Sequence, residues 1–150
     1  MLLILAIWLG IKWYRHRMKK RRWLAINQQL SALELTYQNN KDQQQLLTDV
    51  SVFLRRFVKF QLNQGGATTL AGSNWITHLN QYDQSQPFAA YEAALTVGVY
   101  QADCEYDAQG LLQTSREFIH KQVMKPQVMK PTDPAQFKPG ETDEMEQHHV

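Results

Sequence analysis

The first 22 residues constrain this chain more than any other stretch. Residues 1–11 read Met-Leu-Leu-Ile-Leu-Ala-Ile-Trp-Leu-Gly-Ile and hold no charged side chain. Residues 12–22 follow at once and hold seven Lys or Arg residues and no acid. An apolar segment that meets a dense basic cluster is typical of an anchor at an anionic cytoplasmic membrane surface. We therefore predict a transmembrane or juxtamembrane anchor over residues 1–22. Its expected membrane-interface residues are Lys12, Trp13, Tyr14, Arg15, Arg17, Lys19, Lys20, Arg21 and Arg22.

The order of the two segments predicts an orientation. A secretory signal peptide carries its positive charges before the apolar run and a small-residue cleavage site after it. Here the basic residues come second, which favours an uncleaved, single-pass anchor. The excess of Lys and Arg on its C-terminal side then predicts an N-terminus outside and a C-terminal domain in the cytoplasm.

The apolar run is short for a spanning helix. Residues 1–11 rise about 16 Å as a helix and residues 1–14 about 21 Å, against a hydrocarbon core of about 30 Å. Two interpretations follow: the start of a longer transmembrane helix is missing, which we favour, or the helix lies partly inserted with its aromatic residues at the headgroups. A helix docked on a soluble core is disfavoured, because seven cations would lack acidic partners nearby in sequence. The cations either stop translocation or bind anionic lipid.

The net charge of +2 conceals an asymmetry. Beyond Arg22 the chain holds nine of its 16 Lys and Arg residues and all 14 of its Asp and Glu residues, a net charge of −5. The positive charge is therefore local, which argues against a general nucleic-acid-binding surface. A single cysteine, Cys104, excludes an internal disulfide.

Apolar periodicity predicts a helical domain over residues 23–122. Residues 12–38 continue the anchor as a helix and stop near Asn39 and Asn40. Residues 43–63 show the strongest helical stripe, which we interpret as a core face rather than a partner-binding face. We expect a connecting loop at residues 64–69 and then a helix over 70–79 with Ser73 as its cap. The inward residues of that helix are expected to be Trp75, Ile76 and Leu79.

The remaining domain is predicted as helix and loop. Pro87 opens a short helix with Phe88, Tyr91, Ala94 and Leu95 on its inner face. Residues 96–100 favour strand but stand alone, so we predict no sheet from them. A last helix over 108–122, capped by Asp107, buries Leu111, Leu112, Phe118 and Ile119. The fold class is thus all-α, with an anchor helix that continues into a domain of four to five helices.

Few residues suggest chemistry. Arg55, Arg56 and Lys59 lie off the apolar stripe of their helix and form a candidate partner patch. Asp103, Cys104 and Glu105 gather two acids and a thiol, but their spacing matches no standard metal-ligand pattern. His78 is expected at the surface or partly buried. The sequence therefore predicts no catalytic residue, metal site or cofactor site.

Residues 123–150 change in composition. The stretch Val-Met-Lys-Pro occurs twice in succession, at residues 123–126 and 128–131, and four of the five prolines lie in this part of the chain. Acidic residues gather at 141–146. We predict a disordered tail, because this composition cannot build a core.

The whole pattern resembles a domain-of-unknown-function family of small bacterial inner-membrane proteins. The residues that carry the resemblance are the apolar helix ending in Trp-Tyr-Arg at 13–15, the basic run to Arg22, Leu30 and Leu33, residues 52–56, residues 70–79, Tyr100, and Phe118 with Ile119. The resemblance covers residues 1–122. Such proteins are encoded beside MoxR-type AAA+ ATPases and von Willebrand factor A proteins of the BatA/BatB kind.

The resemblance implies a place and a role. It implies the bacterial inner membrane as the location and a non-enzymatic adaptor or scaffold in an envelope chaperone or complex-assembly system as the function. An AAA+ ATPase or a von Willebrand A protein is then the expected partner, together with anionic lipid. The alternative is a membrane-linked regulatory domain that binds a peptide or nucleic acid through Arg55, Arg56 and Lys59.

Overall fold

A computed structural model describes residues 1–125 of the chain, and this part contains helices and no strand. Its α-helices are α1 (Leu2–Asn40), α2 (Gln43–Gln61), α3 (Gly72–Asn80), α4 (Glu92–Thr96) and α5 (Ala108–Met124). Three short 3-10 helices connect them: η1 (Gly65–Thr69), η2 (Ala89–Tyr91) and η3 (Gly98–Tyr100). The all-α prediction is confirmed. Of the tail predicted over 123–150, Val123 and Met124 belong to α5 instead, and residues 126–150 lie outside the described residues.

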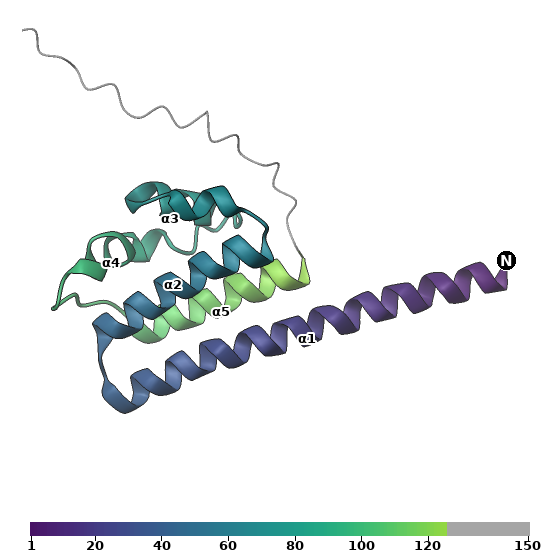
Figure 1. Ribbon diagram of the computed structural model, residues 1–150, viewed down its shortest axis with the longest axis horizontal. Coiled ribbons are helices and arrows are strands. Elements are labelled where there is room, and N and C mark those ends of the chain that lie inside the picture. The colour runs from purple at the N-terminus through teal and green to yellow at the C-terminus, as the bar shows by residue number, and fades with distance from the viewer. Residues whose placement is uncertain (126–150) are drawn as a thin grey trace, which may run out of the picture.

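The helices form layers around a central pair. Figure 1 shows α2 and α5 side by side, with α1 along one side of the pair and α3 and α4 on the other. The N-terminal part of α1 runs past the C-terminal end of α5 and away from the domain (Figure 1). One helix therefore belongs to the domain along one part of its length and stands clear of it along the other.

The turn between α1 and α2 follows from its polar residues. Lys41 adopts the left-handed conformation (φ 56°), and its N–H donates to the Tyr37 carbonyl at 2.8 Å, which closes the end of α1. Asp42 then accepts from the Gln45 N–H at 3.0 Å and caps α2. The predicted stop of the first helix at Asn39 and Asn40 is confirmed.

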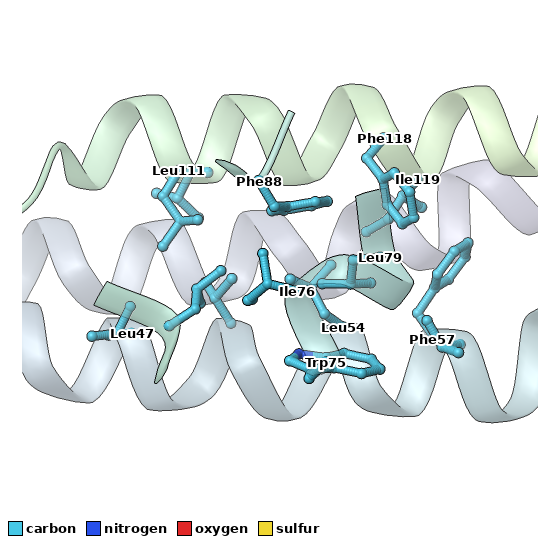
Figure 2. Packing of buried hydrophobic residues seen from close by; sticks show 14 of the residues in the cluster. Leu47, Leu54, Phe57, Trp75, Ile76, Leu79, Phe88, Leu111, Phe118 and Ile119 are labelled. Carbon is cyan, nitrogen blue, oxygen red and sulfur yellow. The ribbon is translucent and has the colours of Figure 1, made fainter. Parts of the chain in front are cut away.

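The core lies where α3 packs into the α2–α5 pair. Trp75, Ile76 and Leu79 are buried there, as predicted, beside Leu54 of α2 and Ile119 of α5 (Figure 2). An aromatic cluster adjoins them around Phe118, whose ring makes edge contacts with Phe57, Tyr82 and Phe88 at centroid distances of 6.2, 6.2 and 5.1 Å. The core thus joins both predicted helical stripes, of α2 and of α5.

Two local predictions are wrong. Residues 65–69 form the 3-10 helix η1 rather than a plain loop, because Thr68 and Thr69 donate their hydroxyls to the Gly65 and Gly66 carbonyls. Ser73 does not cap α3: the helix begins one residue before it, at Gly72, and extended Ala71 takes the N-cap position without a side-chain acceptor. The Asp107 cap is confirmed, since its carboxylate accepts from the Gly110 N–H at 2.9 Å.

A single arginine connects α1 to α5. Arg116 of α5 donates to the Glu34 carboxylate at 2.8 Å and to the Asn27 side-chain oxygen at 3.1 Å. The two acceptors lie two helical turns apart on α1, so the guanidinium fixes how far α1 can slide along α5. Ile26 and Leu30 bury their side chains on the same helix. The register of α1 is thereby set by charge and by packing together.

The core assignment predicts a contrast between two phenylalanines. Phe118→Ala removes a ring that is 1% exposed and contacts three other aromatic rings. We expect it to lower the free energy of unfolding by about 3–5 kcal/mol, because the cavity adds to the lost burial. Phe60→Ala, at a side chain that is 70% exposed, should cost less than about 0.5 kcal/mol. Urea unfolding followed by circular dichroism measures both, and equal losses would contradict the assignment.

Candidate functional site

The part of α1 that leaves the domain carries many apolar side chains that no other element of residues 1–125 covers. Every residue from Met1 to Arg17 is exposed, and we call this segment the arm. Its large apolar side chains include Leu2 at 84% exposure and Trp13 at 64%. Monomeric soluble proteins rarely leave so continuous an apolar surface uncovered, and such surfaces mark contacts with membranes or other proteins. The arm is therefore the first candidate site.

Among residues 1–125, no helix combines the length and the apolar composition that crossing a membrane requires. The prediction of a spanning anchor over residues 1–22 thus finds no support in the described helices. The physical reason is the early start of the basic run, since Lys12 follows an apolar stretch well short of the roughly 20 residues that span a bilayer.

The basic run lies where α1 meets the domain. Lys12, Arg15 and Arg17 project from the arm itself, and Lys20, Arg21 and Arg22 follow as exposed side chains. Neither of the two ion pairs found in residues 1–125 involves the run. Two of its members instead lie over aromatic rings one helical turn earlier, Lys12 over Trp8 at 4.9 Å and Arg17 over Trp13 at 5.2 Å. The predicted interface residues are therefore displayed together, with their charge available to a partner outside the described part of the chain.

The run divides between two faces of α1. Lys12 and Lys19 lie at steps of about two helical turns before Ile26, so they continue the face that packs on α2 and α5. Arg17 and Arg21 lie on a different face, where they line a shallow concavity of about 200 Å³ with Trp13, Tyr14 and Met18. Two charges can therefore be removed from either face. One face continues the surface that packs on α2 and α5, and the other lines the smaller concavity.

A larger concavity forms where the arm leaves the end of α5. It measures about 1180 Å³, and we call it the basic corner. Its cations are Lys12, Arg15 and Lys19 of α1 and Lys125 at the end of α5. Lys19 is half-buried and donates to the Met124 carbonyl at 3.1 Å, which satisfies one of the last carbonyls of α5. Two elements far apart in sequence thus build one site.

The predicted partner patch on α2 separates into two parts. Arg55 is half-buried: its guanidinium donates to the Leu70 carbonyl at 2.8 Å and lies 4.5 Å from the centre of the Trp75 ring. Burial lowers the pKa of the Arg55 guanidinium, an effect that nearby Tyr100 opposes. Arg56 and Lys59 are exposed. Arg55 is therefore tied to the fold, and its two neighbours keep their charges at the surface.

The stretch at Asp103–Glu105 lies on a loop beside the α1–α2 turn. Asp103 and Glu105 are exposed, while Cys104 is half-buried and packs beside Gly98 against the core. A Cβ at Gly98 would lie within 2.4 Å of the Cys104 sulfur, so glycine is required for this approach. In residues 1–125 no group of three His, Cys, Asp or Glu side chains is arranged to hold a metal ion. The thiol serves in packing at this position.

His78 and Tyr82 form a buried pair that the sequence analysis does not predict. His78 is 8% exposed, its Nε2 atom lies 3.2 Å from the Tyr82 hydroxyl, and its ring stacks near Trp75. Burial raises the pKa of Tyr82 to about 12, so the hydroxyl keeps its proton. The signal was available, because His78 follows Trp75 by one helical turn and Tyr82 follows His78 by another. The pair is buried within the aromatic core, where it stabilises the packing of α3.

The fold and the exposed arm define a small all-helical domain with a projecting N-terminal helix. A family model covers this whole arrangement, matching residues 1–121, and the chain belongs to that family, described as Domain of unknown function (DUF4381). The description states neither an activity nor a partner. No curated protein and no solved structure matches the chain.

The buried histidine predicts how stability depends on pH. Burial lowers the pKa of His78 below its ordinary value of 6.5, so the unfolded chain binds this proton more readily than the folded chain. The contribution of His78 to stability is therefore complete above pH 6.5 and is lost as the pH falls through the lowered pKa. His78→Gln should flatten this part of the profile, measured as the urea midpoint between about pH 8 and about pH 5. An unchanged slope in the variant would contradict the assignment.

Proposed function

We propose that this protein is a non-enzymatic adaptor that attaches to a membrane through the arm and presents its helical domain to a protein partner. The observation that carries the proposal is the exposed apolar surface of residues 1–11, which continues directly into the basic run. Apolar surface of this kind gains free energy on leaving water, and a neighbouring basic run adds attraction to anionic lipid. Both features lie on one helix and act in the same direction.

The magnitudes favour stable attachment. Burying one exposed Leu or Ile side chain contributes about 1.5–3 kcal/mol. Each Lys or Arg near an anionic surface contributes about 1 kcal/mol. The arm offers several such apolar side chains, among them Leu5, Ile7 and Leu9. Trp8 and Trp13 suit the boundary between the headgroups and the acyl chains, because their rings are amphipathic.

The orientation of the proposal follows the charge. The basic run favours the cytoplasmic side, so in this proposal the domain stands in the cytoplasm and the N-terminus points into the bilayer. The family resemblance makes the bacterial inner membrane the proposed location. It also makes an AAA+ ATPase of the MoxR type or a von Willebrand A protein the proposed partner. Each of these assignments belongs to the proposal and is open to a direct test.

A second candidate function rests on one groove. Ile26 of α1 and Phe53, Phe57 and Phe60 of α2 line a concavity of about 240 Å³ with Arg56 at its edge. Apolar and aromatic surface beside an exposed arginine suits a peptide better than nucleic acid, since nucleic-acid surfaces are more positively charged. The alternative is therefore a membrane-linked regulatory domain that binds a peptide in this groove.

Substitutions in the arm test the attachment. Leu5→Glu with Leu9→Glu places two charges in the apolar part of the arm and should abolish flotation of the protein with phospholipid vesicles. Leu24→Glu with Leu35→Glu makes the same chemical change on the same helix, at two side chains that are each 59% exposed. This control should float like the unchanged protein. Equal flotation of both variants would contradict attachment through the arm.

Cross-linking tests the adaptor role. The full chain, cross-linked in cells of its source and purified in mild detergent, should recover an AAA+ ATPase or a von Willebrand A protein. Recovery should be lost with the arm variant if the membrane brings the partners together. If the adaptor proposal is right, Arg56→Glu with Lys59→Glu should leave this recovery unchanged. Weaker partner binding in this variant would place the binding site at the α2 groove instead. Absence of both protein classes from the cross-linked material contradicts the adaptor proposal and favours the peptide-binding alternative.

A further inference from the structure

The basic corner joins two chemically different surfaces. Lys12, Arg15 and Lys19 come from α1, and Lys125 comes from the end of α5. The apolar lining comes from Trp8, Leu9, Ile11 and Trp13 on the arm and from Met124, and His16 and His120 complete the lining. The lining contains no acidic side chain. The corner therefore offers cations and a continuous apolar wall to the same occupant.

The local arrangement explains why the corner stays open. Past the end of α5, no element of residues 1–125 covers the face of α1 that packs on the domain, and its side chains change from Ile26 and Trp23 to Lys19 and Lys12. Arg116 fixes α1 along α5 through Glu34 and Asn27, so the angle between the arm and the helix end is set within the domain. The corner is thus a feature of the fold, formed before any ligand binds.

The chemistry of the corner selects its occupant. A free anion would use the cations and leave the apolar wall in water. An apolar chain would use the wall and leave the cations unpaired. An anionic phospholipid satisfies both, because its phosphate accepts from Lys and Arg while its acyl chain covers the arm. The arm leads from the corner toward its apolar end, which is the direction an acyl chain would follow.

We propose that the basic corner binds the headgroup of one anionic phospholipid, with its phosphate between Lys19 and Lys125 and its acyl chain along Trp8 and Leu9. The inference rests on the proposed membrane attachment and goes beyond it. It assigns lipid selectivity to one face of α1, and it turns the C-terminal end of α5 toward the bilayer. The arm accounts for attachment, and the corner accounts for the choice of lipid and the orientation of the domain.

The experiment compares two faces of one helix. The corner variant is Arg15→Gln with Lys19→Gln, and the control variant is Arg17→Gln with Arg21→Gln, which removes the same charge from the face with the smaller concavity. A third variant, Lys125→Gln, removes a cation that is distant in sequence from the basic run. Binding of the full chain is measured by co-sedimentation with phosphatidylcholine vesicles, with and without phosphatidylglycerol. Circular dichroism confirms that each variant folds.

The proposal predicts a selective loss. The corner variant should lose at least about tenfold more of the gain that phosphatidylglycerol gives than the control variant loses, because both remove two charges but only the corner variant removes contacts with the bound phosphate. Lys125→Gln should lose about fivefold, the value for one cation near an anionic surface. The control variant should lose less than the corner variant. Binding to pure phosphatidylcholine should be the same for all three, since the uncharged residues 1–11 of the arm are unchanged.

Several outcomes would overturn the proposal. Equal losses for the corner and control variants would mean that the run acts by general electrostatic attraction, and an unaffected Lys125→Gln would remove α5 from the site. Either result leaves attachment through the arm intact. A corner variant that keeps its lipid selectivity but loses binding to a single-stranded oligonucleotide would assign the corner to nucleic acid instead. Loss of binding to both kinds of vesicle by the Leu5→Glu, Leu9→Glu variant tests the attachment separately.

Discussion

The packing of α1 against α2 and α5 is the constraint on which the rest of the structure depends. Ile26 and Leu30 bury α1 in the domain, and Arg116 holds its register through Glu34 and Asn27. Because the helix is continuous from Leu2 to Asn40, whatever fixes its domain part also aims its exposed part. A flexible joint at the domain edge would make the arm a simple tether. Because the helix is continuous, the arm instead projects from the domain in one defined direction (Figure 1).

One face of α1 changes from apolar to basic residues along its length, and this change connects the fold to the proposed function. The same face is apolar where α5 covers it and basic where α5 ends, and the half-buried Lys19 marks the change by donating to the Met124 carbonyl. Residues 1–11 beyond it hold no charged side chain on any face and are all exposed, which is rare for a helix of a monomeric soluble domain. In the proposed attachment the two contributions are physically separate: apolar burial would hold the arm, and the cations at the helix end would orient the domain.

The helical periodicity of the sequence was enough to predict the main elements. The stripe over residues 43–63 correctly predicted that α2 presents a buried core face, and the inward residues predicted for the last helix are buried. Asp107 could be predicted as a cap because Asp is a preferred residue directly before a helix. Local chemistry without a periodic signal was harder. Ser73 has the composition of a cap, but Gly72 allows the helix to begin earlier, and that choice depends on backbone conformation (φ 56°) rather than on composition.

The candidate sites were predicted unevenly, for a similar reason. The basic run could be recognised because its residues are contiguous. The corner could not, since Lys125 joins it only through the packing of α5 on α1. Arg55 was grouped with Arg56 and Lys59 by spacing, yet a guanidinium that reaches the Leu70 carbonyl and the Trp75 ring serves the fold. His78 and Tyr82 were missed as a buried pair, because burial of a polar side chain is a tertiary property.

The depth of the four tryptophans in a bilayer tests the account most directly. Variants that keep Trp75 together with one of Trp8, Trp13 or Trp23 would be bound to vesicles that contain phospholipids brominated along their acyl chains, which quench nearby indole fluorescence. The account predicts strong quenching of Trp8 and Trp13, weak quenching of Trp23 and none of the buried Trp75. Trp8 and Trp13 that are quenched no more than Trp75 would contradict the central claim that the arm enters the membrane while the domain stays outside it.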